Sequence, residues 1–329
     1  MNIPIHYLRT AKWILQGKWK AAQLSPEVLQ NARGKIVLAY HGIDMVNGTS
    51  VNTKFRGVKK FEEEIRLLKK HTNVISLKDY VDDKLNPEKL NVAITFDDGF
   101  QNNFFLAKPI LEKHNLPGTF FITPIWEQEK NILWADLVDQ VTSFAPHTIS
   151  IAGEAYTKNI FGKYFHTSGL SIHQHVITQN GSFIEELYTE FMPFAKFMQN
   201  DSVDIYWKVM TPRMVKELSD CDLFTIGSHG FTHTNLCFLS NEETIDELKI
   251  SKIILEKLIQ QPVDFFAAPF GAHDERTISL TRQAGYTHQV FATLFIKKLE
   301  TEKDIVPRFG INPYLSPKHQ LLFIANKKF

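Results

Sequence analysis

Short apolar runs alternate with longer amphipathic stretches along this chain, and the alternation constrains the fold more than any other feature of the sequence. Runs such as residues 91–96 and 224–228 are rich in β-branched and aromatic residues, as buried strands are. Stretches such as residues 58–71 repeat apolar residues at helical spacing. This alternation favours a parallel sheet or barrel covered by helices. A chain of 329 residues with 43% hydrophobic content can bury such a core.

The predicted elements lie on both sides of a long central segment. Strands are expected at residues 35–40, 73–76, 91–96, 118–123, 224–228 and 264–268. Helices are expected at residues 58–71, 102–114, 240–260 and 274–284. The third of these helices opens with a capping box formed by Ser240 and Glu243. In a barrel of this kind, the side chains that do chemistry lie at the carboxyl ends of the strands.

Residues 124–212 interrupt the alternation. Their predicted elements are strands at residues 147–151 and 173–178 and a helix at residues 184–198. We interpret the segment as an insertion that caps the barrel mouth and influences substrate choice, with a packing element or an oligomer contact as the alternative. His173 and His175 fit exposed polar positions of a strand better than a metal site.

Two polar clusters each follow a predicted strand. The first is Asp97 with Asp98, and the second is His229 with His233. Consecutive residues at a strand end point in different directions, so one carboxylate can bind a cation while the other stays free as a base. Histidines four residues apart would share one face of a helical turn and could bind the same ion. One oxygen and two nitrogens leave positions open for water and substrate, as catalytic metal sites require.

These clusters belong to a set of segments that resembles the motifs of the polysaccharide deacetylases, a carbohydrate esterase family with the NodB-homology fold. The segments are residues 37–42, 95–100, 228–233, 266–271 and 306–308. The fourth resembles the form Phe-Ala-Tyr-Pro-Phe-Gly, with Ala268 in place of the tyrosine.

The resemblance implies a distorted (β/α)7-type barrel with a large insertion. The barrel would comprise residues 35–123 and 213–312, with residues 124–212 as the insertion or cap. Residues 1–34 would form an N-terminal helical extension, and residues 313–329 a C-terminal tail.

The resemblance also implies a metal site. The ligands would be Asp98, His229 and His233, and zinc suits this set, with cobalt, nickel or iron as alternatives. A divalent ion there would polarise the carbonyl of the substrate. The oxyanion would meet a backbone N–H of the third motif, in the segment Pro269, Phe270 and Gly271.

The catalytic acid and the arginine that orients the base depart from the family pattern. Most members supply the acid from a Leu-x-His motif near the C-terminus, which this chain lacks. His41 is the candidate here, with a purely structural histidine as the alternative. The third motif lacks its usual arginine, so Arg308 is the candidate that pairs with Asp97 and keeps this base ionised. The alternative for Arg308 is a surface or core-closing residue.

The resemblance implies a metal-dependent hydrolase that removes an N-acetyl group, or alternatively an O-acetyl group, from a sugar in cell-surface glycan or polysaccharide biosynthesis. Two alternatives remain: a hydrolase of another amide or C–N bond, such as a sugar deformylase, and a catalytically silent carbohydrate-binding relative. No nucleic-acid partner is expected, because the formal net charge is +1 and no basic stripe is interleaved with aromatic residues. Cys221 and Cys237 provide no disulfide framework.

The N-terminal residues bear on the location of the protein. Cationic residues interrupt residues 1–24, so we expect neither a signal peptide nor a membrane span there, and a cytoplasmic protein. These residues could form a helix that contacts an anionic membrane surface peripherally, or one that packs on the domain. A cytoplasmic location favours a lipid-linked or nucleotide-linked sugar over a finished polymer as the substrate.

Overall fold

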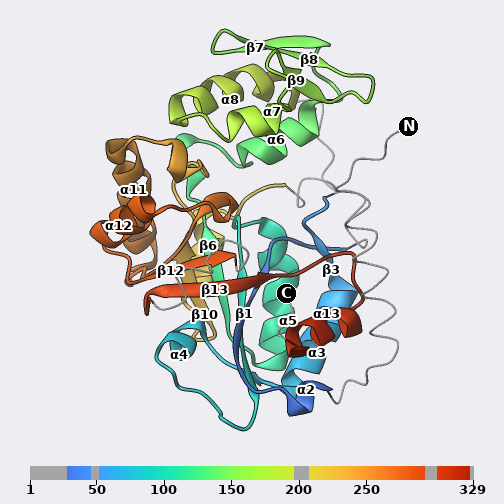
Figure 1. Cartoon of the computed structure of the whole chain (residues 1–329), viewed down its shortest axis with the longest axis vertical. Coiled ribbons are helices and arrows are strands. Elements are labelled where there is room, and N and C mark those ends of the chain that lie inside the picture. Colours follow the sequence, from blue (N-terminus) through green and yellow to red (C-terminus); the bar gives the residue numbers. More distant parts are fainter. Residues whose placement is uncertain (1–27, 46–51, 196–206, 293–301, 327–329) are drawn as a thin grey trace.

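The computed structural model describes residues 28–45, 52–195, 207–292 and 302–326. Within these residues, the central sheet has eight parallel strands (Figure 1). They are β1 (Gly34–Tyr40), β4 (Asn73–Val74), β5 (Leu90–Phe96), β6 (Gly118–Ile122), β10 (Phe224–Ser228), β11 (Phe265–Ala267), β12 (His288–Ala292) and β13 (Ile305–Gly310). Seven of these described strands close into a barrel in the order β1-β13-β12-β11-β10-β6-β5. The predicted (β/α)7-type fold is therefore confirmed.

Strand β1 closes the barrel because it pairs with β5 on one side and with β13 on the other. All of β1 pairs with β5, and Val37 to Ala39 pair with Arg308 to Gly310 of β13. Strand β4 stays outside the ring, since it pairs with the first residues of β5 while β6 pairs with the last ones. Closure thus brings the chain's first and last barrel strands side by side.

Side chains along the strands alternate between the barrel interior and the helices. Val37, Ala93 and Phe121 belong to an interior cluster, and their sequence neighbours Leu38 and Ile94 belong to the outer cluster that includes helix residues. This period of two is the geometry of a pleated strand. Full burial of an aliphatic or aromatic side chain stabilises a fold by roughly 1.5–3 kcal/mol, so both layers contribute to the stability of the barrel.

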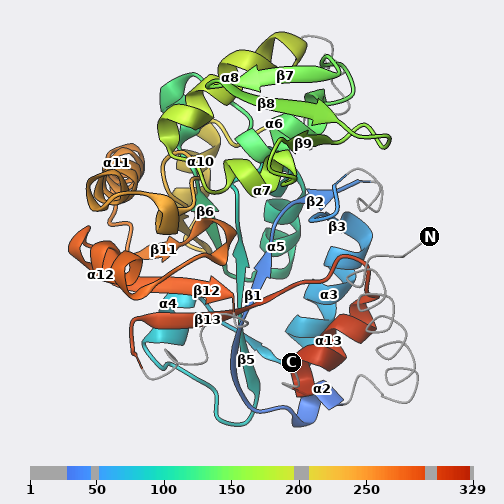
Figure 2. The same cartoon turned by 45° about the horizontal axis from the view of Figure 1, so that its top comes forward.

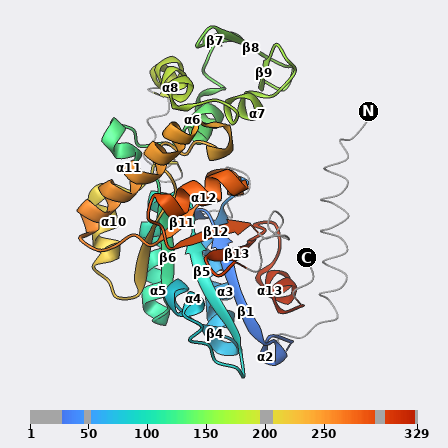
Figure 3. The ribbon, with the colours of Figure 1, turned by 60° about the vertical axis from the view of Figure 1, so that its left-hand side comes forward.

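The helices of the barrel cover its outer face. They are α2 (Val28–Asn31), α3 (Val58–His71), α4 (Leu77–Val81), α5 (Lys108–His114), α10 (Pro212–Ser219), α11 (Asn241–Ile259), α12 (Glu275–Gln283) and α13 (Pro317–Asn326). Figure 3 shows α10 and α11 on one side of the barrel and α13 on the other. The predicted capping box is present at the start of α11, where Ser240 and Glu243 bond each other's backbone. The helix expected at residues 102–114 begins instead as a π-helical turn, η1 (Asn103–Ala107), before α5.

The segment between β6 and α10 forms a separate layer over one end of the barrel (Figures 1 and 2). Its larger elements are α6 (Trp134–Val141), β7 (Thr148–Ile151), β8 (Glu154–Lys158), β9 (Tyr164–His166), α7 (Ile172–Val176) and α8 (Gly181–Ala195). The layer has its own buried cluster, which includes Trp134, Tyr156 and Phe191. A short bridge between Phe100 and Val209 joins it to the chain that follows β5. This arrangement agrees with an insertion over the barrel mouth.

The strand expected at residues 173–178 is wrong, because these residues begin in helix α7. Ser171 caps the helix, and Gln174 completes a capping box with it. Ile172 and Val176 are the buried residues of α7, at helical spacing. The alternation of His173 and His175 resembles a strand pattern, and for this reason the helix was not predicted.

The segment that follows the last barrel strand contains helix α13. Helix α13 buries Leu321 and Ile324 in the outer cluster with residues of α3. The buried Arg56 donates hydrogen bonds to the carbonyl oxygens of Pro313 (2.9 Å) and Leu315 (2.6 Å), which ties this segment to the barrel. The helix expected on a membrane surface, within residues 1–24, lies outside the described residues. In the part of the chain that the structure describes, none of the helices has the length and apolar content needed to cross a membrane.

Candidate metal centre

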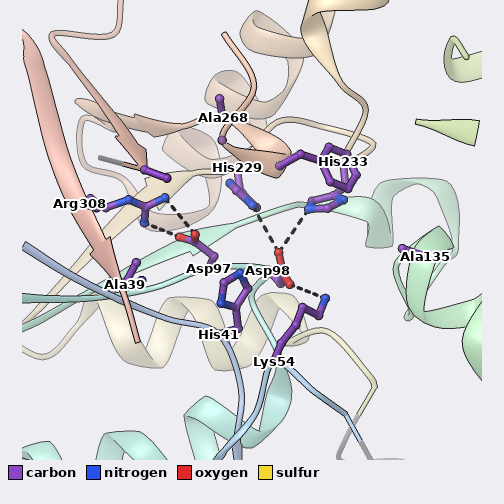
Figure 4. A pocket seen from close by; sticks show the side chains of 14 residues that line it. Ala39, His41, Lys54, Asp97, Asp98, Ala135, His229, His233, Ala268 and Arg308 are labelled. Atoms are coloured by element: carbon purple, nitrogen blue, oxygen red, sulfur yellow. Dashed lines mark hydrogen bonds and ion pairs between the residues drawn. The ribbon is translucent and has the colours of Figure 1, made fainter. Parts of the chain in front are cut away.

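The two adjacent aspartates separate at a left-handed turn after β5. The N–H of Asp97 donates to the carbonyl oxygen of Tyr40 (3.0 Å), which continues the pairing with β1. Asp98 and Gly99 then take positive φ angles of 69° and 65°. Non-glycine residues rarely adopt this conformation, and they do so mainly at strained turns and functional sites. As a result, Asp97 points toward Arg308 and Asp98 toward the two histidines (Figure 4).

The two histidines lie on an irregular loop after β10, so the expected helical turn is wrong. Gly230 and His233 have φ angles of 78° and 59°, which interrupt any helix. The carboxylate of Glu247 on α11 fixes the loop by accepting hydrogen bonds from the N–H groups of Phe231 (2.9 Å) and Thr232 (3.0 Å). Burial raises the pKa of Glu247 despite these bonds. In place of the expected helical turn, the structure has an irregular loop whose backbone N–H groups bind the buried carboxylate of Glu247.

Despite the different backbone, the three expected ligands converge. The Oδ1 atom of Asp98 lies 3.3 Å from Nε2 of His229 and 3.2 Å from Nε2 of His233. The ligand atoms that the three residues offer all lie within 4.8 Å of one another, and all three residues are buried. One carboxylate and two imidazoles are a donor set that suits zinc and related divalent ions.

The protonation states of the two imidazoles also fit metal binding. The Nδ1 atom of His229 lies 2.7 Å from the carbonyl oxygen of Ala267, and because a carbonyl only accepts, Nδ1 carries the proton. Nε2 of His229 is then free to bind an ion, and the bond to Ala267 orients the ring. Burial lowers the pKa of His233, although Asp98 opposes this effect, so His233 is neutral as a ligand must be.

Asp98 is ionised well below neutral pH. Burial alone would raise its pKa, but the charge of Lys54 and the neighbouring imidazoles of His229 and His233 outweigh burial and hold the pKa well below its usual value. The Nζ atom of Lys54 lies 3.1 Å from Oδ2 of Asp98 and 3.5 Å from Oδ1 of Asp136 on α6. Lys54 therefore connects the candidate ligand to the insertion.

Asp97 forms a bidentate ion pair with Arg308 of β13. The two guanidinium nitrogens lie 2.6 Å and 2.9 Å from its carboxylate oxygens, and Arg308 also donates to Oγ1 of Thr95 (3.2 Å). Burial opposes ionisation of Asp97, but Arg308, followed by His229, lowers its pKa below the ordinary value. The pairing expected from the sequence is present, and it holds Asp97 as an ionised carboxylate beside the candidate metal ligands.

Replacing Arg308 by glutamine (Arg308→Gln) should shift the pH dependence of activity. Without the guanidinium, burial remains as the main influence on Asp97, so its pKa rises and less of the base is ionised at a given pH. The acidic limb of the kcat/KM profile is expected to move to higher pH, by about 1–3 pH units. Arg308→Lys, which keeps the charge, should move it less. An unchanged limb in Arg308→Gln would contradict the role of the pair.

His41 lies at the end of β1 and lines the same cavity, with its side chain beside both aspartates in Figure 4. The side-chain amide of Asn103 donates to the His41 carbonyl oxygen (2.9 Å), which fixes this strand end. Burial lowers the pKa of His41, and the charges of Asp98 and Asp97 only partly offset that effect. His41 is therefore neutral at rest, and it can act as an acid only after it takes up a proton during the reaction.

The third motif forms one wall of the cavity. Phe270 has a φ of 61°, and its ring packs edge-on against His233 with ring centroids 4.8 Å apart. The N–H of Gly271 donates to the carbonyl oxygen of Ala268 (3.0 Å), which leaves the N–H of Phe270 as the candidate for the oxyanion. Phe270 and Gly271 line the cavity, whereas Pro269 is buried and does not.

The cavity that these residues enclose has a volume of about 280 Å³. Its lining includes five small residues, which are Ala39, Ala135, Ala268, Ala292 and Gly310. Lys54 also lines this cavity and Asp136 pairs with Lys54, although no sequence pattern singles out either residue. They stand in no motif, and a charged residue is most often solvated, so only the fold reveals their proximity.

The comparisons with known proteins agree with this geometry. The family model for polysaccharide deacetylase matches residues 84–179 and 182–289, more than half of the chain. None of the curated proteins searched matches the sequence.

Solved structures of similar fold include three deacetylases at low sequence identity. The Streptococcus pyogenes deacetylase PplD, in complex with acetate, is 17% identical with a TM-score of 0.55, over 88% of this chain and 98% of that one. A Bacillus cereus polysaccharide deacetylase is 20% identical with a TM-score of 0.55, over 89% and 69%. A de-N-acetylase from Aggregatibacter actinomycetemcomitans is 16% identical with a TM-score of 0.52, over 85% and 96%. The family match and the barrel lead to one conclusion: this chain belongs to the polysaccharide deacetylase family, hydrolases of the carbohydrate esterase type that act on carbon–nitrogen bonds.

Proposed function

We propose that this protein removes the N-acetyl group from a sugar of a cell-surface glycan, with a divalent ion bound by Asp98, His229 and His233. The observation that carries the proposal is that the two adjacent aspartates face different partners. Asp98 faces two imidazoles at 3.3 Å and 3.2 Å, whereas Asp97 faces a guanidinium at 2.6 Å and 2.9 Å. A base and a metal site thus share one cavity without sharing a carboxylate. One of the proteins of similar structure is a de-N-acetylase, which supports the choice of an N-acetyl group.

A divalent ion held by Asp98, His229 and His233 would polarise the acetyl carbonyl and make a water molecule more acidic. Asp97 takes a proton from the attacking water, because it is ionised and Arg308 holds its orientation. The N–H of Phe270 donates a hydrogen bond to the oxygen on which negative charge develops. His41 takes up a proton from solvent and gives it to the departing amine, and Asp97 returns the proton of the water molecule to solvent after the reaction. The ring of Phe270 packs beside His233 and lines the cavity.

Zinc suits the proposed ligand set, and cobalt, nickel and iron remain the alternatives because the same donors suit them. We place the reaction in the cytoplasm, with peripheral membrane contact through the helix expected within residues 1–24, on the sequence argument alone. Release of acetate or formate from a panel of N-acetylated, O-acetylated and N-formylated sugars tests the activity. We expect acetate from N-acetyl sugars with the metal-loaded protein. Formate release alone would identify a deformylase, and binding of sugar without any release would identify a silent relative.

Replacing His41 by alanine (His41→Ala) should lower kcat by about 100-fold or more, the usual contribution of a general acid. Its metal content should stay unchanged, because His41 is not among the three clustered ligands. Elemental analysis and steady-state kinetics on the same preparation check both expectations. A substrate with a better leaving group should recover most of the loss, because it needs less protonation. Full activity in His41→Ala would place the acid elsewhere.

A further inference from the structure

The turn between β8 and β9, in the insertion, exposes two adjacent apolar side chains. Ile160 is 93% exposed and Phe161 79%, the largest exposed fractions among the large apolar side chains of the part of the chain that the structure describes. We call these two residues the apolar tip. Figure 2 shows the β8–β9 hairpin projecting from the edge of the insertion layer. Single exposed apolar residues are common on protein surfaces, whereas two together on a protruding turn indicate contact with another molecule.

The apolar tip occupies the two central positions of a well-fixed β-turn. The N–H of Gly162 donates to the carbonyl oxygen of Asn159 (2.9 Å), and Gly162 takes a positive φ of 72°. The Oδ1 atom of Asn159 accepts hydrogen bonds from the N–H groups of Phe161 (2.9 Å) and Lys163 (3.0 Å). Asn159 and Gly162 thus supply the chemistry that a turn needs, and such turns commonly carry polar residues, glycine or proline at their centre. Formation of the turn therefore does not explain why its central residues are apolar.

The surroundings of the apolar tip are cationic. Lys163 follows the turn directly and is exposed. Lys158 precedes it and donates from Nζ to the carbonyl oxygen of Ala145 (2.5 Å), a bond that leaves its charge without a compensating anion. Residues 140–184 contain one acidic residue, Glu154, which begins β8 at the end away from the turn and lies 2.8 Å from Nε2 of His166. The charge beside the tip is therefore complementary to an anionic surface.

A third exposed apolar side chain lies at the same end of the small sheet. The N–H of Lys158 donates to the carbonyl oxygen of His147 (2.9 Å), which places the segment before β7 beside the end of β8. Phe144, in this segment, is 52% exposed. The apolar surface at this end thus extends beyond the turn itself.

The shape of the tip favours a lipid surface over a protein partner. A specific protein interface buries about 800 Å² on each partner, an area that a protruding two-residue turn does not provide. A bilayer, in contrast, closes around a protruding apolar side chain, which enters the boundary between headgroups and acyl chains. Lysines beside that side chain then reach the phosphates of anionic lipids. The arrangement of apolar and cationic residues around the turn fits this second case.

From these observations we infer that the insertion docks the protein on an anionic bilayer surface through Ile160 and Phe161, with Lys158 and Lys163 at the lipid phosphates. The inference goes beyond the proposed function and does not depend on it, because neither the metal ligands nor the sugar takes part. It also names a contact separate from the one expected of residues 1–24. The hairpin would enter only the interfacial region of the bilayer.

Vesicle sedimentation of the full-length protein tests the docking. The vesicles consist of phosphatidylcholine alone or of phosphatidylcholine mixed with phosphatidylglycerol. We expect binding to the anionic vesicles, weakened by added salt because salt screens the lysines. The double variant Ile160→Ser with Phe161→Ser should lower the partition coefficient by at least about tenfold, since burial of a single large apolar side chain is already worth about that factor.

Three further variants locate the effect. Ile253→Ser makes the same change at a 62% exposed position of α11, outside the insertion, and should bind vesicles as the wild type does. Phe161→Trp keeps an aromatic ring suited to the membrane interface and should retain binding. Lys163→Gln should lower the partition coefficient on anionic vesicles by about fivefold, the usual effect of one lysine near such a surface.

The outcomes separate this inference from its alternatives. Circular dichroism should show the native fold in the double variant, because both side chains are exposed. Acetate release from a soluble N-acetyl sugar should be equal in the double variant and the wild type, so failure of the proposed function leaves the vesicle test unaffected. Binding that the double variant retains would place the contact elsewhere, residues 1–24 included, and would overturn the inference.

Two other results would also contradict it. Equal binding to vesicles with and without phosphatidylglycerol would overturn the choice of an anionic surface. Absence of vesicle binding would overturn the docking altogether, and self-association that the double variant loses would then assign the apolar tip to a second copy of the chain.

Discussion

Asp98→Asn is expected to abolish metal binding and, with it, the deacetylase activity. The substitution keeps the shape of the side chain but removes the negative charge that faces Nε2 of both His229 and His233. Loss of a partner that merely orients a ligand already costs about 10–100-fold in metal affinity, so loss of a charged ligand should cost at least about 100-fold. Elemental analysis after metal loading and dialysis gives the metal content, and acetate release gives the activity.

Asp246→Asn serves as the matched control, because it makes the same chemical change at an exposed position of α11. Its metal content and activity should equal those of the wild type. Circular dichroism of Asp98→Asn must show the native fold, since a misfolded protein would also lose metal. A folded Asp98→Asn protein with full metal content would refute the ligand assignment.

Asp97→Asn should give the complementary result, with metal retained and activity lost. Asp97 faces Arg308 rather than the histidine cluster. Loss of its charge should therefore impair proton abstraction from water more than metal binding. Removal of a general base lowers rates by about 10²–10⁴-fold, and kcat/KM should fall within that range. The same elemental analysis and kinetics as for Asp98→Asn make the comparison direct.

Asp97→Asn also removes the carboxylate that the buried Arg308 binds, so the variant can lose stability as well as activity. A second substitution controls for this effect. Arg308 is 4% exposed, and without Asp97 its charge lacks its main carboxylate. Breaking a buried ion pair from one side destabilises proteins by about 3–5 kcal/mol. The double variant Asp97→Asn with Arg308→Gln removes both charges, so it should recover part of the lost thermal stability without recovering activity. Recovered activity in the double variant would exclude Asp97 as the base.

The alternation of strand and helix patterns favoured a parallel sheet or barrel because its signals are local and repeated. Ring strands such as β1 and β5 are apolar runs, and caps such as Ser240 with Glu243 mark helix starts. Strands β12 and β13 were not among the predicted strands, so the seven-stranded form of the barrel came from the family resemblance. The pairing of Asp97 with Arg308 was also predictable, since a base in a buried site needs a cation and the third motif offered none. The resemblance to a known family supplied the roles of the individual residues, which spacing alone left open.

Other features of the site depend on tertiary contacts that no local pattern records. The loop of His229 and His233 is irregular because Glu247, on the next helix, binds its backbone. The link from Lys54 to Asp136 joins residues 82 positions apart, at a distance of 3.5 Å, across the boundary of the insertion. Neither residue is unusual in its own surroundings. The neutral state of His41, which follows from burial, could not be read from the sequence either.

The position of β13 has a consequence for how the protein acquires its activity. This strand enters the ring between β12 and β1, and it carries Arg308 to the buried carboxylate of Asp97. Before the last strand docks, Asp97 has no guanidinium to orient its carboxylate. We therefore expect a chain still lacking residues 305–310 to be unable to hold the base in its working position. Maturation of the catalytic site is thus coupled to completion of the ring, and a nascent or clipped chain should be inactive even where the metal ligands have already assembled.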